Sequence, residues 1–219
     1  DKLSELDFEW IRLLYLYPEM VDDTLIQYVK NNPKIAKYMD IPLQHIDDQV
    51  LKRMNRRTDE KSIRELISKL KNAGIAVRTT FICGFPGETQ EQFEKLEKFV
   101  KDVKFDYAGF FAYSREEGTP ADKLDGHIDE SVKEARAKKL AAVQERIIKT
   151  HNKELIVKQV KVIYDDIDYD KQTFVGRTQT QAPDIDNVTL FSADEEVKIG
   201  EFYTVEITGA DGIDLVGKV

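Results

Sequence analysis

Hydrophobic and polar positions alternate with a period of two between Ile75 and Cys83, in the sequence IAVRTTFIC. This period is typical of a β-strand whose two faces meet different surroundings. Because Arg78 and Thr80 lie on the same face, we expect that face to be partly polar. Apolar residues then repeat at helical intervals over Glu91–Val103. The pattern therefore predicts a strand, a short turn and a helix in direct succession.

The turn between this strand and this helix has the sequence GFPGET, residues 84–89. Gly84 and Gly87 allow positive φ angles or a close approach of the backbone to a ligand, and Pro86 stiffens the bend. Thr89 and Gln92 have the spacing of a capping box at the start of the helix. The turn is a candidate ligand site, and the alternative is an ordinary tight connection between a strand and a helix.

The same strand and helix alternation runs through the first two thirds of the chain. Strands are predicted at Trp10–Tyr17, Tyr38–Leu43, Ile75–Cys83 and Asp106–Tyr113, and helices at Asp22–Lys30, from Thr58 to Gly74, Glu91–Val103 and Asp129–His151. The helix that ends at Gly74 has a clear apolar stripe, made by Ile63, Leu66, Ile67 and Leu70. This order predicts an α/β fold, with a parallel sheet and helices outside it.

Polar residues follow three of the predicted strands at their carboxyl ends. Gln44 and His45 follow the second strand, the GFPGET turn follows the third, and residues 113–116 follow the fourth. Ligands of parallel sheets bind where these ends meet. Arg78 is the strongest candidate, and its alternative is a structural pair with an acidic neighbour such as Asp40. For His45 a ligand-binding role and the capping of a loop are equally open.

The pattern changes after residue 154, and we expect domains at residues 1–153 and 154–219. Five short strands are predicted at Ile156–Tyr164, Phe174–Gln179, Val188–Phe191, Phe202–Thr208 and Leu215–Val219. Their spacing predicts a small antiparallel β-barrel. Residues 155–219 contain six Lys or Arg and thirteen Asp or Glu, so most of the net charge of −8 lies in this part.

The acidity of the predicted barrel bears on its partners. It would repel phosphate backbones, so no direct nucleic-acid binding by this domain is expected, and a basic protein partner fits better. Asp184 and Asp186 are the candidate partner contacts, because the segment QAPDID is expected to be a loop from which side chains project freely. The alternative is that the acidity only keeps a small domain in solution.

Length and cysteine content bear on the location of the protein and on the cofactors that its own residues can hold. The 219 residues contain no apolar run near the roughly 20 residues that span a bilayer, and no signal peptide is visible, so we expect no membrane association. The single cysteine suits a reducing compartment, and we expect a cytoplasmic protein. Cys83 lies on the buried face of its strand and is interpreted as a core residue. One cysteine by itself holds no iron-sulfur cluster.

Five segments together resemble the radical S-adenosylmethionine (SAM) methylthiotransferases. They are IRLLYLYP (11–18), DIPLQH (40–45), VLKRMNR (50–56), the strand and turn at 77–89, and YSREEGTPA (113–121). The tail is similar to the TRAM domain of that family, which is OB-like. Within the family, DIPLQH, YSREEGTPA and GRTQTQAPDID resemble the RimO-type branch, which modifies an aspartate of ribosomal protein S-twelve. The resemblance implies the later strands of a partial (β/α) TIM-like barrel, followed by TRAM.

The resemblance also implies a cofactor set and a site. Such enzymes use SAM and two 4Fe-4S clusters, and they add a methylthio group to the β-carbon of the target aspartate. The positions that match the SAM site are Gln44, His45, Arg78, Thr80, Gly84, Phe85, Pro86, Gly87 and Tyr113. The cysteine motifs that hold both clusters in the family are absent from this chain, so we expect it to be inactive alone. A tRNA-modifying methylthiotransferase, a β/α enzyme with a different cofactor and a protein-binding module without catalysis stay open as alternatives.

Overall fold

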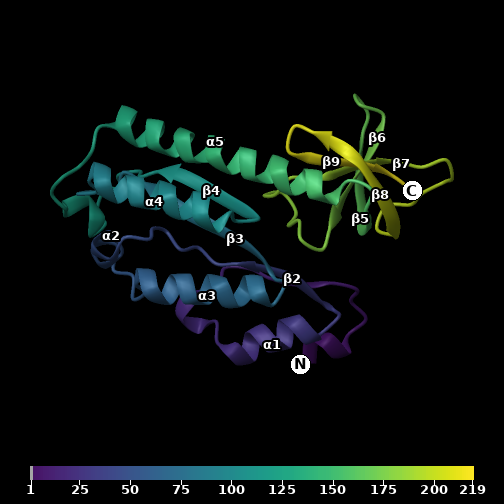
Figure 1. The fold of residues 1–219 in the computed structure, drawn as a ribbon, viewed down its shortest axis with the longest axis horizontal. Coiled ribbons are helices and arrows are strands. Elements are labelled where there is room, and N and C mark those ends of the chain that lie inside the picture. Colours follow the sequence, from purple (N-terminus) through teal and green to yellow (C-terminus); the bar gives the residue numbers. More distant parts are fainter. Residues whose placement is uncertain (1) are drawn as a thin grey trace.

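The computed structural model describes residues 2–219 and shows two parts joined by one long helix (Figure 1). The first part contains a four-stranded parallel sheet in the order β1, β2, β3, β4. Its strands are β1 (Ile11–Leu13), β2 (Ile35–Asp40), β3 (Ala76–Cys83) and β4 (Tyr107–Ala112). Its helices are α1 (Asp23–Asn31), α2 (Asp48–Arg53), α3 (Glu60–Asn72), α4 (Gln90–Val103) and α5 (Glu130–Leu155). Short 3-10 helices lie at Lys2–Glu5, Pro18–Met20 and Ala121–Lys123. The predicted α/β class with a parallel sheet is confirmed.

The helix boundaries follow from local capping. Thr89 caps α4 and forms with Gln92 the predicted capping box, in which each side chain accepts the backbone N–H of the other residue. Asp59 makes a similar box with Ser62 at the start of α3. The apolar stripe predicted for α3 is buried, and Gly74 follows its end with a φ of +72°. These devices satisfy backbone groups that a helix end would otherwise leave unpaired.

In this part the bounds of two strands were predicted inaccurately, and one short helix was not predicted. The first strand was predicted at Trp10–Tyr17 but pairs only over Ile11–Leu13, since Tyr15 takes a φ of +59° and the chain leaves the sheet. The second strand was predicted at Tyr38–Leu43 but begins earlier, at Ile35, and ends at Asp40. The helix α2 was not predicted, because its six residues are too short to show a helical repeat.

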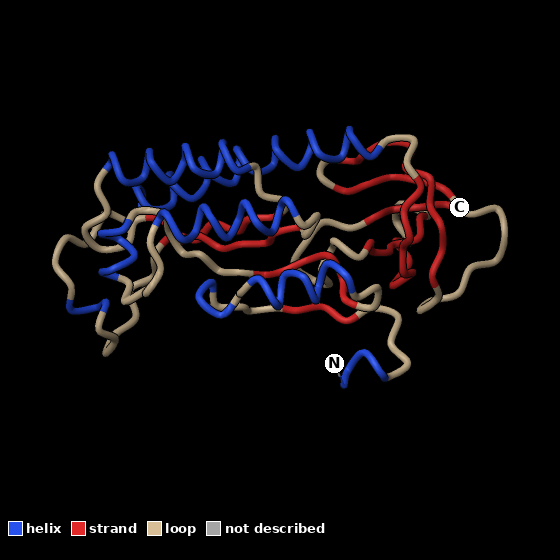
Figure 2. Tube along the Cα trace, turned by 60° about the horizontal axis from the view of Figure 1, so that its bottom comes forward, coloured by secondary structure: helices blue, strands red, loops and turns tan. Residues whose placement is uncertain are grey.

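The second part is a closed five-stranded barrel in the order β5, β6, β7, β9, β8. Its strands are β5 (Gln159–Asp168), β6 (Thr173–Thr178), β7 (Thr189–Ser192), β8 (Phe202–Asp211) and β9 (Asp214–Lys218). The barrel was predicted, but not its one parallel pair, β7 with β9. A separate apolar core that includes Val162, Phe191 and Val205 fills it. Figure 2 shows its strands crossing beside the end of the longest helix.

The two faces of the parallel sheet have different surroundings. Val77, Thr79, Phe81 and Cys83 of β3 are buried on the face that α1, α3, α4 and α5 cover. Arg78 and Thr80 lie on the opposite face, which we call the concave face, in register with Tyr107 and Gly109 of β4. The predicted alternation of β3 is therefore confirmed.

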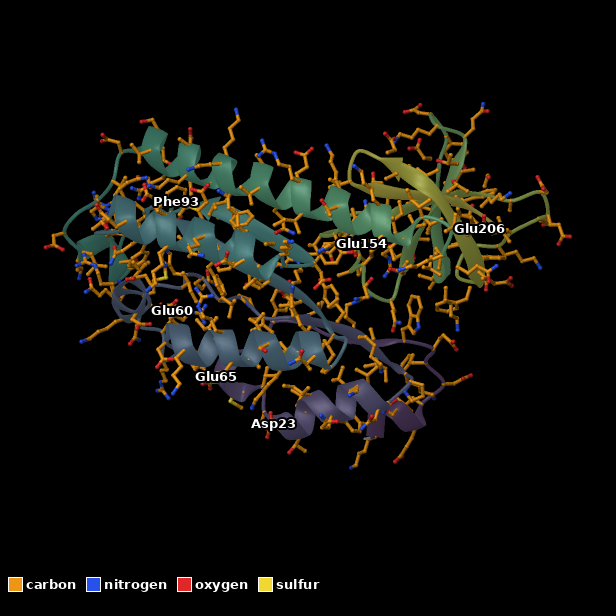
Figure 3. The ribbon with its side chains drawn as sticks, in the orientation of Figure 1. Asp23, Glu60, Glu65, Phe93, Glu154 and Glu206 are labelled. Atoms are coloured by element: carbon orange, nitrogen blue, oxygen red, sulfur yellow. The ribbon has the colours of Figure 1, made fainter. Side chains whose placement is uncertain are left out.

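The barrel contacts the concave face through its loop between Thr178 and Val188. Arg12 donates from Nη2 to the carbonyl oxygen of Gln181 at 2.8 Å, and Tyr38 donates its hydroxyl to Asp186 at 2.7 Å. Ala182 packs against Tyr38 in a small apolar cluster. Beside this contact lies a cavity of about 820 Å³ lined by residues that include Trp10, Tyr107 and Glu154, the last of which is labelled in Figure 3. The barrel therefore closes the amino-terminal end of the concave face.

Candidate functional site at the carboxyl ends of the strands

The turn at residues 84–88 is fixed by its own hydrogen bonds. The backbone N–H of Gly84 donates to Oε2 of Glu88 at 2.7 Å, and that of Glu88 donates to the carbonyl of Phe85 at 2.9 Å. The N–H of Gly87 donates to the carbonyl of Gly126 at 2.8 Å, in the loop before α5. Gly84 and Gly87 have φ angles of +76° and +82°, the left-handed region that glycine adopts without strain.

Two basic side chains pass close to these glycines. A Cβ atom on Gly84 would overlap the stem of Lys133, whose Nζ donates to the carbonyl of Tyr113 at 2.8 Å. A Cβ atom on Gly87 would lie 2.9 Å from the guanidinium carbon of Arg53. Arg53 donates to the carbonyl of Pro86 at 3.0 Å and to that of Asp125 at 2.9 Å. Both positions favour glycine by conformation, and at Gly84 packing against the Lys133 stem adds to this, whereas the flexible end of Arg53 can move away from Gly87.

A buried carboxylate lies under the turn. The Glu88 side chain is fully buried, and its Oε1 accepts a hydrogen bond from Nη1 of Arg136 on α5 at 2.8 Å. His45 is also fully buried, with Nε2 3.6 Å from Oε2 of Glu88. Its Nδ1 accepts the backbone N–H of Asp47 at 3.0 Å, as the capping of a loop requires, while its Nε2 has no hydrogen-bond partner among residues 2–219. The carboxylate thus joins the turn, α5 and the segment after β2.

Sequence reasoning missed Glu88 and Arg136 as a pair. They lie 48 residues apart, and nothing in the local pattern of α5 marks Arg136 as inward-facing. The sequence offers one weak signal for Glu88, which is its position directly after the turn. An acidic residue directly after a glycine-bracketed turn is in reach of the backbone N–H groups of that turn, which attract a carboxylate.

Three polar atoms at the strand ends are buried without a hydrogen-bond partner among residues 2–219, and Nε2 of His45 is one of these. The other two are Oε1 of Gln44 and the hydroxyl of Tyr113. Gln44 has a φ of +69°, and its backbone bridges to β3 through Thr80 and Ile82. The Tyr113 ring packs edge to face on Phe85, with centroids 5.1 Å apart. Buried polar atoms normally have partners, so these three atoms suit a bound polar ligand.

Arg78 lies on the concave face as predicted, and it is held by two carboxylates. Its Nη1 donates to Oδ1 of Asp40 at 3.1 Å, and its Nε lies 3.5 Å from Oδ1 of Asp186. The alternative prediction, a pair with Asp40, is therefore present in the structure. The contact with Asp186 adds a link to the barrel that the sequence did not suggest.

The prediction that Asp184 and Asp186 both project freely is wrong for Asp186. Its side chain is only 2% exposed, because it turns inward to Arg78, Tyr38 and the N–H of Ala182. Burial, the main cause, raises the pKa of Asp186 above its usual value, against the opposing effect of the hydrogen bonds from Ala182 and Tyr38. Asp184 is exposed, at a φ of +64°.

Two further features limit the chemistry of the described residues. The Cys83 thiol is buried, and desolvation, together with the nearby charge of Glu88, raises its pKa to about 12. No group of three His, Cys, Asp or Glu within residues 2–219 is arranged to hold a metal ion. In the same residues, no helix is both long and apolar enough to cross a membrane.

Comparison with protein families assigns both parts of the chain. Residues 2–100 match the model of the radical SAM superfamily, and residues 156–219 match the model of a TRAM domain. The parallel sheet with its candidate site thus belongs to the radical SAM class, and the closed barrel is a TRAM domain. The expected partial TIM-like barrel followed by an OB-like barrel is confirmed.

Curated relatives place the chain within that class. It is 44% identical, over 99% of its length, to the ribosomal protein uS12 methylthiotransferase RimO of Thermoanaerobacter sp. (strain X514). It is 45% identical over its whole length to the enzyme of the same name from Geobacter sulfurreducens. The chain belongs with the RimO-type radical SAM methylthiotransferases. It spans about half the length of these relatives, 50% and 49% respectively.

A solved structure supports the fold alone. The coproporphyrinogen III oxidase HemN from Escherichia coli, described as a radical SAM enzyme, has a TM-score of 0.54. The match covers 78% of this chain and 44% of that chain, at 13% identity. At this identity the likeness concerns the arrangement of helices and strands.

Proposed function

We propose that the chain is the carboxyl-terminal part of a radical SAM methylthiotransferase that modifies an aspartate of ribosomal protein uS12. The observation that carries this proposal is the similarity to the RimO relatives over the whole length of this chain, at 44–45% identity. The arrangement at the carboxyl ends of β2, β3 and β4 supports it, because a glycine-bracketed turn and three unpaired buried polar atoms lie there.

The residues at these strand ends fit SAM. Phe85, Tyr113 and Val50 form a buried apolar cluster beside the turn, while Gln44 and the Tyr113 hydroxyl offer an acceptor and a donor without partners. The turn at 84–87 would lie against the nucleoside, with Thr80 on the concave face below. When bound, the cofactor would supply radical chemistry. The role of this chain is to bind and orient it.

Arg78 and His45 have a different place in this proposal. Arg78 already has two carboxylate partners, Asp40 and Asp186, and Nδ1 of His45 accepts the Asp47 N–H. Nε2 of His45 has no hydrogen-bond partner among the described residues and lies 3.6 Å from the Glu88 carboxylate. We assign them to positioning: Arg78 fixes the barrel loop against the sheet, and His45 fixes the segment that carries Gln44. Gln44, Tyr113 and the turn are the residues proposed to touch the cofactor.

The residues of this chain do not fit iron-sulfur clusters. A cluster needs several thiolate ligands, and the sequence has one cysteine, which is buried with a raised pKa. We therefore derive no step through a cluster, and we propose that the chain alone is inactive in methylthiolation.

We propose that the acidic barrel binds the basic ribosomal protein away from the target aspartate. The strands of the barrel and the turn at 84–87 lie near opposite ends of α5 (Figure 1), although the barrel loop at 178–188 reaches the concave face at Arg78. The acidic domain therefore acts on encounter and orientation, through charges that attract a cationic partner over a distance of about one Debye length, ~8 Å at physiological ionic strength. Asp184 is its candidate contact.

Ligand-detected NMR of the chain with SAM and with adenosine tests the cofactor site. Binding in the high micromolar to millimolar range is expected, and Tyr113→Phe should weaken it several-fold by removing one hydrogen bond of about 1 kcal/mol. The control is Tyr169→Phe, which alters a tyrosine that is 79% exposed on the barrel. No saturation transfer at millimolar ligand, or equal binding by the Tyr113 variant, would contradict the assignment.

A second measurement tests the barrel. Association of the chain with uS12 should slow on Asp184→Lys and with added salt. Glu65→Lys makes the same change of charge on α3 (Figure 3) and should have little effect. Association that is insensitive to salt and to Asp184→Lys would mean that the acidity serves solubility alone.

A further inference from the structure

Two tyrosines at the carboxyl end of β1 point away from the core. Leu16 between them packs on the main core, and its N–H donates to the carbonyl of Asp40 at 2.9 Å. Tyr15 is 76% exposed and Tyr17 is 59% exposed. Tyr15 holds a φ of +59°, a conformation that residues other than glycine rarely adopt. The backbone thus displays two large aromatic rings to solvent.

Cations without carboxylate partners lie beside these rings. Arg56 places its guanidinium carbon 5.6 Å from the centroid of the Tyr17 ring. Arg56, Arg57 and Lys52 belong to one segment at and after the end of α2, and no carboxylate in the described part of the chain lies within 4.0 Å of their charged groups. By contrast, Arg53 in the same segment is paired with Asp125. We call Tyr15, Tyr17, Lys52, Arg56 and Arg57 the Tyr–Arg surface.

We infer that the Tyr–Arg surface binds single-stranded RNA. Unpaired bases stack on exposed aromatic rings and on guanidinium planes, while cations contact the phosphates between them. The surface offers both, and Arg56 and Tyr17 lie side by side in it. An acidic peptide would use the cations but would gain nothing specific from two exposed rings, so RNA accounts for more of what is present.

The net charge of the chain does not oppose this inference. The acidic excess lies in residues 155–219, and the barrel is at the opposite end of the molecule from α2 (Figure 1). Exposed charges further apart than about 8 Å are largely screened at physiological ionic strength. The inference deepens the proposed function and rests on it for biological meaning: a ribosomal protein would present its target aspartate beside RNA.

The test is fluorescence anisotropy with a labelled 12-nucleotide oligouridylate and the full 219-residue chain. Arg56→Ala/Arg57→Ala should lower the affinity at least fivefold and should reduce the slope of log K against log salt by about 1.4, for two lost phosphate contacts. Tyr17→Ala should lower the affinity about fivefold or more, with the salt slope unchanged, because it removes stacking only.

The matched control is Lys138→Ala/Lys153→Ala, which removes two exposed cations from α5 and should leave RNA affinity unchanged. Circular dichroism and melting temperature verify that each variant is folded. If the control variant lost as much RNA affinity as Arg56→Ala/Arg57→Ala, the effect would come from net charge alone and the inference would be overturned. The absence of RNA binding in 50 mM salt would also overturn it. A polyglutamate peptide that binds as tightly as the RNA would assign the surface to acidic peptides instead.

The outcome is separable from that of the proposed cofactor site. Arg56, Arg57 and Tyr17 are not among the residues proposed to touch SAM, so their variants should show unchanged saturation transfer from SAM. RNA binding without SAM binding would overturn the cofactor site and leave the Tyr–Arg surface standing. SAM binding without RNA binding would overturn the inference about the Tyr–Arg surface and leave the cofactor site standing.

Discussion

Gly84 donates its backbone N–H to the buried side chain of Glu88 at 2.7 Å, so the candidate cofactor turn closes on a carboxylate of its own. Glu88→Gln keeps the size of the side chain but leaves Arg136 without a counter-charge in the interior. Because breaking a buried pair by removing one partner costs about 3–5 kcal/mol, we expect a loss near 3 kcal/mol in the free energy of unfolding. Urea denaturation measures it.

The double variant Glu88→Gln/Arg136→Met tests whether the two side chains stabilise the chain through their contact with each other. It removes both charges, so it should be less destabilised than the sum of the two single variants. Glu134→Gln is the surface control on the same helix and should change stability by less than about 0.5 kcal/mol. Additive losses in the double variant would show that Glu88 and Arg136 act independently.

Gly84→Ala should destabilise the chain more than Gly118→Ala. Both glycines have positive φ angles, +76° and +82°, so both variants bear a backbone cost of roughly 1–2 kcal/mol. Only at Gly84 would the new methyl group overlap Lys133, whereas nothing lies within 4 Å of it at Gly118. Overpacking adds about 1–3 kcal/mol. Thermal unfolding of the two variants compares the costs, and equal shifts in melting temperature would contradict the overlap.

Asp186→Asn should change how stability depends on pH. Burial raises the folded-state pKa of Asp186 above its unfolded value, so the folded state binds the proton more tightly. The contribution of Asp186 is then largest below the unfolded pKa and decreases as pH rises through the raised pKa. The difference in unfolding free energy, wild type minus Asp186→Asn, should therefore fall as pH increases from the ordinary aspartate range near 4 upward.

Urea denaturation of both proteins from pH 4 to pH 7 measures this difference. Asp184→Asn is the matched control, since it removes one exposed carboxylate from the same loop. A difference that grows with pH would mean that the ion pair with Arg78 outweighs burial.

Cys83 should be inert in the folded chain. Its thiol is completely buried, and its pKa is raised to about 12, so almost no thiolate forms at pH 8. We expect no reaction with a disulfide reagent such as DTNB until urea unfolds the chain. Rapid labelling of the native chain would contradict the packing of β3.

The sequence predicted best where one periodic signal dominated. The stripe of α3, the capping box of α4 and the alternation of β3 were read correctly because each depends on neighbours within a few residues. The placement of Gln44, the turn and Tyr113 at one end of the sheet was also predicted, and their role in binding a cofactor stays a prediction. Their approach follows from the topology of a parallel sheet.

What the sequence did not reveal depends on contacts over long separations. The inward face of α5 includes Lys133, Arg136 and Gln144, and such polar residues give no apolar stripe to read. Asp186 looked like a loop residue, and only the fold shows that the loop lies against Tyr38, which is 148 residues away. Pairs of this kind leave no local pattern.

The helix α5 sets a minimum reach for any partner that engages both ends of the molecule. Near its start it touches the turn through Lys133 and Arg136, and near its end Asn152 donates to Ile213 of the barrel at 2.7 Å. From Lys133 to Asn152 the helix rises about 28 Å at 1.5 Å per residue. A fully extended peptide needs about 9 residues to cover that length. Short peptides around a target side chain would therefore engage one end only, and a folded protein of larger diameter would gain from both.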